Sequence, residues 1–115
     1  MTRWLAPLLL ALAPAALAAA EPAKGIVMVG EMIAHPGKGD ALYARMQREI
    51  PPIPQTKGRR AYEVVRDGKN PDRVVIVEIW DSAEDHAASV KQIDPQAIRE
   101  VKALMASMKG ETFKR

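Results

Sequence analysis

The chain has 115 residues, a formal net charge of +3, 48% hydrophobic residues and no cysteine. This length fits one domain, and the missing cysteines exclude disulfides, thiol nucleophiles and cysteine-bound metal sites. The apolar fraction is too high for a disordered chain. The small basic excess is not clustered, which argues against a nucleic-acid partner, and we expect the adjacent pair Arg59 and Arg60 to lie in solvent at a strand edge.

The first twenty residues have the three parts of a secretory signal peptide. Arg3 supplies positive charge, residues 4–12 form a short apolar run, and small residues at cleavage-site spacing follow. The alternative is an uncleaved membrane anchor, but prolines interrupt the run and a spanning helix needs roughly 20 apolar residues. The sequence therefore predicts a bacterial signal peptide over residues 1–20 and a periplasmic or secreted domain over residues 21–115, without membrane association after cleavage.

The first part of the mature chain predicts a strand followed by a helix. Residues 26–34 are almost continuously apolar, as in a strand that is buried on both faces. Asp40 suits the N-cap of a helix from residue 41 to about residue 50. Its apolar stripe consists of Leu42, Tyr43, Met46 and Ile50. Prolines at positions 51, 52 and 54 then end the helix.

Two strands and a hairpin are predicted in the middle of the chain. Residues 60–66 alternate between polar and apolar types, and residues 73–80 have the strongest strand pattern. Between them, residues 67–72 are rich in turn-forming types. In the strand over residues 73–80, Val75, Val77 and Ile79 share one face. This wholly apolar face is expected to pack against the helices.

The last part of the chain predicts a helix in two segments and a short strand. Ser82 and Asp85 have the spacing of a capping box for a helix that runs to about residue 92. Asp94 and Pro95 restart it as N-cap and first helical residue. The stripe of Ile98, Val101, Met105 and Met108 extends it to about Lys109. A last strand is expected over residues 111–115.

The resulting order, β-α-β-β-α-β, is that of the α+β ferredoxin-like fold, an antiparallel sheet with both helices on one face. Because the strands are apolar on both faces, the second face needs a cover. A homodimer that packs sheet on sheet is the simplest cover, and a pocket can form between the two layers or within each half.

Four short motifs follow one another along the predicted elements. They are His35–Lys38 before the first helix, Tyr62–Glu63 in the second strand, Asn70–Arg73 at the hairpin and, most strongly, Val77–His86 at the strand-to-helix junction. Together they resemble the antibiotic biosynthesis monooxygenase family, whose fold is a dimeric α/β barrel. The resemblance implies a small aromatic ligand and, as in better-known members, cofactor-independent oxygenation of quinol- or anthrone-like compounds. The deprotonated substrate itself would reduce oxygen.

Glu78 and Trp80 are the first candidate site residues, because residues two apart in a strand share a face. A buried carboxylate can act as a catalytic base, and the indole can stack on an aromatic ligand. The alternative is a structural pair, with Glu78 bonded to a neighbouring Arg or Tyr and Trp80 sealing the dimer.

His86, one turn into the following helix, is the second catalytic candidate, as an acid or base that reaches over the sheet end. The alternative is a surface histidine, and His35 in its turn is expected to face solvent. Met28, Met32 and Tyr62 are further candidates for binding the aromatic ligand. The methionine spacings fit core stripes better than a copper site, so no metal is expected.

The sequence therefore supports two alternative functions. The first is a periplasmic, cofactor-free monooxygenase that oxidises a quinol- or anthrone-like aromatic with O2. The second is a non-catalytic dimer of the same fold that binds a small molecule or acts in a stress response. Haem degradation is disfavoured, because Gly30 and Val90 stand where the related haem-degrading enzymes have an asparagine and a histidine.

Overall fold

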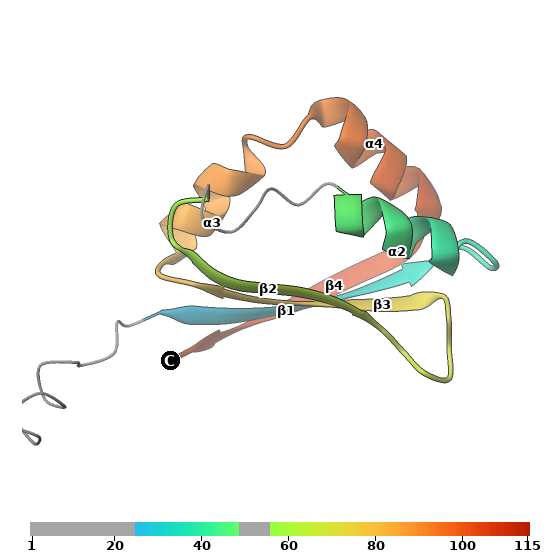
Figure 1. Cartoon of the computed structure of the whole chain (residues 1–115), viewed down its shortest axis with the longest axis horizontal. Helices are drawn as coiled ribbons and strands as arrows, with labels where there is room; N and C mark the ends of the chain where they lie inside the picture. Colours follow the sequence, from blue (N-terminus) through green and yellow to red (C-terminus); the bar gives the residue numbers. More distant parts are fainter. Residues whose placement is uncertain (1–24, 49–55) are drawn as a thin grey trace, which may run out of the picture.

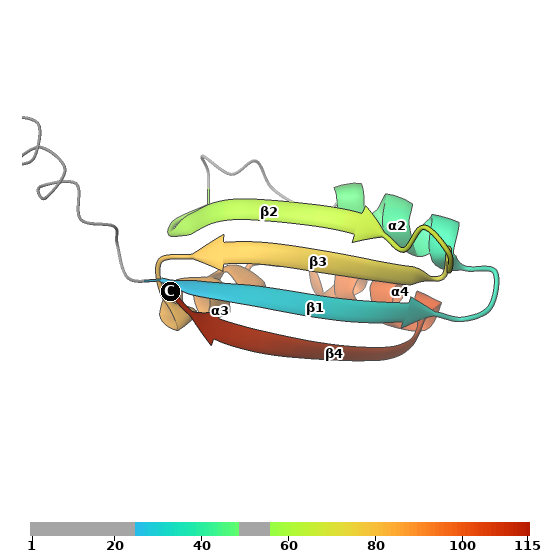
Figure 2. The same ribbon diagram turned by 90° about the horizontal axis from the view of Figure 1, so that it is seen from below.

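The computed structural model describes residues 25–48 and 56–115. In chain order the elements are β1 (Ile26–Ala34), α2 (Gly39–Arg48), β2 (Arg59–Arg66), β3 (Arg73–Trp80), α3 (Ala83–Val90), α4 (Pro95–Leu104) and β4 (Met105–Lys114). The strands form one antiparallel sheet in the order β2-β3-β1-β4, and the helices lie on one face of it (Figure 1, Figure 2). This is the predicted ferredoxin-like α+β fold.

Some predicted features fall outside the described residues. They are the signal peptide over residues 1–20, the helical position of Ile50 and the extended connection through the prolines at 51–54. Among the residues that the structure does describe, no helix is long and apolar enough to cross a membrane.

The core lies between the sheet and the paired helices α2 and α4. Its buried members are Met32, Ala34, Leu42, Val64, Val74 and Ile76. Tyr43, Met46 and Val101 pack around them, half-buried, so the predicted helix stripes are confirmed at these positions. Strands β1, β2 and β3 contribute Met32, Val64, Val74 and Ile76 to this core. These four side chains project from one face of the sheet, because side chains alternate along a strand.

The predicted orientation of β3 is wrong. Its buried residues are Val74, Ile76 and Trp80, which face the helices. Val75, Val77 and Ile79 lie on the opposite face, which none of the described helices covers (Figure 1). Both faces of this strand are apolar enough to be buried, and the face that carries the large indole is the one that the helices cover.

The start of α2 also differs from the prediction. The helix begins at Gly39, so Asp40 lies in its first turn, and the capping carboxylate comes from Asp72 in the β2–β3 hairpin. Asp72 accepts hydrogen bonds from the Gly39 N–H at 2.9 Å and from the Gly37 N–H at 3.1 Å. A Cβ on Gly39 would lie 2.0 Å from the Pro71 carbonyl oxygen, so only glycine allows this approach.

The end of α4 is a second correction. The helix stops at Leu104, and Met105 and Met108 belong to β4, which is ten residues long and pairs with β1 along its length. Without β4, the N–H and C=O groups along that edge of β1 would lack strand partners. Pairing with β1 therefore outweighs the helical spacing of the two methionines.

The two remaining helix starts agree with the prediction. The Ser82 hydroxyl accepts a hydrogen bond from the Asp85 N–H at 3.1 Å, and α3 begins at the next residue. The Asp94 carboxylate accepts one from the Gln96 N–H at 3.0 Å, with Pro95 as the first residue of α4. Helix α3 ends at Val90, two residues before the predicted end.

Candidate functional site

Four side chains form one cross-strand row on the helix-covered face of the sheet. In the register of the sheet, Tyr62 lies opposite Glu78, Glu78 opposite Met28, and Met28 opposite Thr112. Three predicted site residues from three strands are thus neighbours. The sheet register brings them together although Met28 and Glu78 are fifty positions apart in the sequence.

Glu78, Trp80 and His86 form the centre of the candidate site. The Trp80 indole N–H donates a hydrogen bond of 3.0 Å to Glu78 Oε1. The other carboxylate oxygen, Oε2, lies 3.9 Å from His86 Nε2. The His86 ring meets the indole edge-on, with 5.4 Å between ring centroids. The cap at Ser82 fixes where α3 starts, and this start places His86 over the sheet.

These three side chains differ in their access to solvent. Glu78 is 17% exposed and His86 is 25% exposed, whereas Trp80 is 1% exposed. A molecule that approaches this end of the sheet therefore meets the carboxylate and the imidazole before the indole. Trp80 faces the helices, so it cannot seal a dimer across the open face of the sheet. Glu78 is bonded to Trp80 rather than to the Arg or Tyr of the structural alternative.

Arg59 is a site residue that the sequence analysis missed. It is 6% exposed, and its guanidinium carbon lies 5.0 Å from the centroid of the Tyr62 ring. The expectation of a solvated arginine holds only for Arg60, which is exposed and makes two hydrogen bonds, of 2.7 and 2.8 Å, to Asp81. The strand register shifts between Arg59 and Ala61. Simple alternation from Tyr62 would place Arg60 on the helix side, and this irregularity places Arg59 there instead.

The hydroxyl of Tyr62 is held in its protonated form. Burial raises the pKa of this hydroxyl far above its ordinary value, the nearby Glu78 charge raises it further, and Arg59 opposes both effects. At neutral pH Tyr62 is therefore a hydrogen-bond donor in a row that also contains a carboxylate. Such a donor suits the oxygen of a hydroxyaromatic ligand.

The two predicted methionines are separated. Met28 lies in the row of Glu78, whereas Met32 lies opposite Val74, two rows away, and is buried in the core. His35 is exposed in its turn, as predicted. Among the residues that the structure describes, no three His, Cys, Asp or Glu side chains are grouped so that they could hold a metal ion.

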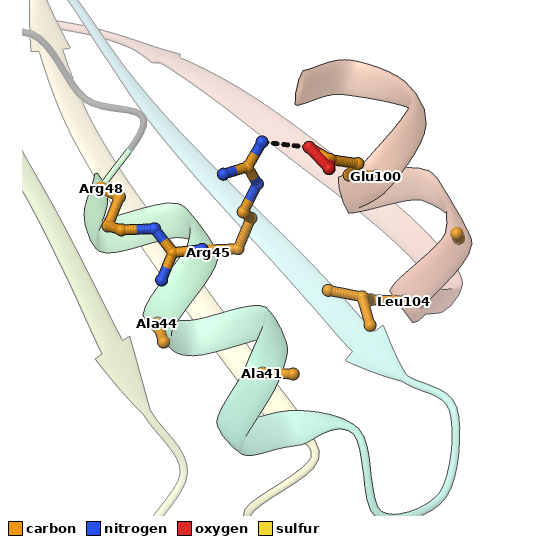
Figure 3. Close-up of a pocket in the computed structure, with 7 residues that line it drawn as sticks. Ala41, Ala44, Arg45, Arg48, Glu100 and Leu104 are labelled. Carbon is orange, nitrogen blue, oxygen red and sulfur yellow. Dashed lines mark hydrogen bonds and ion pairs between the residues drawn. The ribbon is translucent and has the colours of Figure 1, made fainter. Parts of the chain in front are cut away.

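A shallow groove of about 460 Å³ lies between α2 and α4, away from this site (Figure 3). Its lining residues are Ala41, Ala44, Arg45, Arg48, Glu100, Ala103 and Leu104. The ion pair between Arg45 and Glu100 spans the two helices across it (Figure 3). The groove contains none of the predicted site residues.

Comparison with known proteins places this chain in a family. Residues 25–110 match the family model of antibiotic biosynthesis monooxygenases. A comparison with curated proteins gives no significant match. A crystal structure from Chloroflexus aurantiacus that carries the same family name is 33% identical, over 79% of this chain and 92% of that chain, with a TM-score of 0.68.

Two further solved structures are similar. A protein from Shewanella oneidensis is 27% identical over 82% of this chain and 93% of its own, with a TM-score of 0.64. A cofactor-independent oxygenase from Streptomyces nogalater is 13% identical over 80% of this chain and 92% of its own, with a TM-score of 0.59. The likeness to this third structure extends to the fold alone.

Proposed function

The chain belongs to the antibiotic biosynthesis monooxygenase family, and we propose that it oxygenates a quinol- or anthrone-like aromatic with O2 and without a cofactor. The observation that carries this proposal is the Glu78 carboxylate, held by the Trp80 indole on one side and lying beside His86 on the other. The Streptomyces nogalater protein, a cofactor-independent oxygenase, is an example of this reaction class on the same fold.

In the proposed reaction, the protein supplies a base and a hydrogen-bond donor. His86 and Glu78 take a proton from the substrate, because both keep an exposed edge and lie next to each other. The Trp80 N–H fixes the carboxylate so that its free oxygen faces the imidazole. Tyr62 donates a hydrogen bond to the substrate oxygen, whose negative charge grows as the proton leaves.

The substrate itself provides the electrons. Its anion reduces O2. In an anthrone, one oxygen atom becomes the carbonyl oxygen of the former CH2 carbon, and the second leaves as water with the two hydrogens of that carbon. In a quinol, one oxygen atom becomes a hydroxyl group on a ring carbon, and the second leaves as water with two hydrogens as the quinol becomes a hydroxyquinone. For an anthrone the balance is a CH2 group and O2 giving a C=O group and water. The protein's remaining task is to exclude bulk water from the anion, which the buried Trp80 and its neighbours help to do.

The alternative function is a non-catalytic dimer that binds a small molecule. The nearly complete burial of Trp80 favours this alternative, because the indole holds Glu78 in place and offers no free face for stacking. Both functions use the same row of side chains. They differ in whether Glu78 and His86 move a proton.

A homodimer and export are part of the proposal. The open face of the sheet carries Val27, Val29, Val77 and Ile79, flanked by the exposed Val65 and Phe113. A second copy of the chain is the proposed cover of this face, since an apolar patch of this kind is a common protein-protein interface. The pattern of residues 1–20 supports export to the periplasm or beyond. Determining the N-terminal residue of the protein from a bacterial periplasmic extract tests the export proposal.

Oxygen consumption tests the reaction. The purified protein is incubated, after metal chelation, with a panel of hydroquinones and anthrones, and uptake is compared with the autoxidation blank. Uptake above the blank that falls at least about tenfold in both Glu78→Gln and His86→Ala supports the proposal. Glu100→Gln is the matched control, since Glu100 is an exposed glutamate on α4, beside the groove that lies away from the site. If the folded protein consumes no oxygen with any compound of the panel, the oxygenase proposal is refuted and the binding function is the one supported.

A further inference from the structure

We propose that Arg59 is a positioning residue that acts through Tyr62 to favour the anionic form of a bound hydroxyaromatic molecule. The inference rests on the proposed function for its ligand class, and it assigns a role to a residue that the proposed reaction leaves unused. The ligand chemistry is that of a phenolate or of the enolate of a fused-ring ketone.

The burial of Arg59 is the first observation. In the part of the chain that the structure describes, it is the one charged residue that is buried. Removing a guanidinium from water is costly, so a buried arginine is held by interactions with its surroundings in the interior. The next residue, Arg60, is exposed and pairs with Asp81 at the surface, so the sheet edge itself does not require a buried arginine.

The position of the charge is the second observation. Arg59 lies opposite Trp80 in the register of the sheet, and its guanidinium stands over the ring of Tyr62. Tyr62 in turn lies opposite Glu78. The cation and the proposed base therefore flank the same phenol, the cation from the side of the Trp80 row. A cation over an aromatic face is attracted to the ring, which also restricts how the ring can turn.

The electrostatics of Tyr62 agree with this geometry. The positive charge of Arg59 lowers the pKa of the Tyr62 hydroxyl against the stronger effects of burial and Glu78. Arg59 therefore stabilises negative charge at the place where the Tyr62 oxygen lies, and an oxygen bonded to that hydroxyl is in the same field. The Tyr62 hydroxyl keeps its proton, which it can donate in a hydrogen bond to a ligand oxygen.

A dye that reports its own ionisation tests the inference without turnover. Alizarin is a dihydroxyanthraquinone that changes colour when its first hydroxyl ionises. Its absorbance is titrated with pH, free and in the presence of saturating protein. Arg59→Met should raise the bound-dye pKa by about one unit, which is about a tenfold weaker preference for the anion.

Two controls distinguish an effect of the position of the charge from an effect on the stability of the fold. Arg60→Met removes the same charge one residue away and should titrate like wild type, and circular dichroism establishes that each variant is folded. If Arg59→Met does not fold, Tyr62→Phe replaces it, because it removes the hydroxyl through which Arg59 acts. We expect Tyr62→Phe to raise the bound-dye pKa at least as much.

The titration has three possible outcomes for the inference about Arg59. A bound-dye pKa that depends on Arg59, or on Tyr62 where Arg59→Met is unfolded, supports the inference. A dye that binds with the same pKa to wild type and to the folded variant overturns the inference and leaves the proposed aromatic site standing. A dye that binds to none of the folded proteins overturns the aromatic site and the inference together.

Discussion

The two faces of β3 carry almost the same kinds of residue and have opposite environments. Val74, Ile76 and Trp80 are buried under the helices, whereas Val75, Val77 and Ile79 lie on a face that none of the described helices covers. Glu78, the one charged residue between them, shares the buried face. A strand with two apolar faces needs two covers, and residues 25–48 and 56–115 supply only the one that also encloses the candidate site.

The largest expected effect comes from the covered face. Leu42 of α2 is 0% exposed and packs against the core residues of the sheet. Leu42→Ala should lower the free energy of unfolding by about 2–5 kcal/mol, because it removes buried methyl groups and leaves a cavity. Urea unfolding measures the change. Val65→Ala, on the open face, is the control. It should lower the free energy of unfolding of the monomer by less than about 1 kcal/mol.

The second prediction concerns the open face. Val77→Asp should leave the fold intact and weaken self-association by at least about tenfold, because an unpaired carboxylate would be buried between two sheets. Sedimentation velocity at several protein concentrations measures the association. A wild-type protein that sediments as a monomer at every concentration would refute the proposed dimer. It would also mean that the open face tolerates water.

The third prediction tests which aspartate caps α2. Asp72→Ala should lower the free energy of unfolding by about 1 kcal/mol, since it removes the acceptor for the Gly37 and Gly39 N–H groups. Asp40→Ala removes an exposed carboxylate that is paired with Arg66. It should lower the free energy of unfolding by about 0.5 kcal/mol or less. Chemical unfolding of the two variants side by side makes the comparison. Equal costs would contradict the assignment of the cap to Asp72.

The smallest effect is a dependence on pH. Hydrogen bonds from the Lys69 and Asn70 N–H groups, with help from Arg73, lower the pKa of Asp67 in the folded protein. The carboxylate therefore stabilises the fold at pH values above its unfolded pKa. This contribution is lost as the pH falls through the lower, folded pKa. Unfolding measured from neutral to acidic pH should show a shallower loss of stability in Asp67→Asn than in wild type, and parallel curves would contradict the prediction.

Local signals in the sequence predicted much of the fold. The strand bounds of β1 and β3 and the caps at Ser82 and Asp94 follow from residues within a few positions of each other. The same signals placed Glu78, Trp80 and His86 at one junction, and the structure brings their side chains together. Strand period and helix start are enough to predict such a cluster.

The features that were mispredicted depend on distant parts of the chain. The cap of α2 comes from Asp72, more than thirty residues away. The strand conformation of Met105 and Met108 depends on the free edge of β1. The choice between Arg59 and Arg60 depends on an irregularity in the pairing of β2 with β3. None of these partners can be identified from the spacing of neighbouring residues.

The position of β4 has a consequence for how the protein is made. β4 pairs with β1, yet it is synthesised after every other described strand and helix. Until then, one edge of β1 exposes unpaired backbone groups beside apolar side chains, which is a template for aggregation. The slow step in reaching the native state is therefore expected to be the closure of β4 onto β1, since this pairing spans the longest stretch of chain. We therefore expect a nascent chain of this protein to be prone to association at this edge until β4 has emerged.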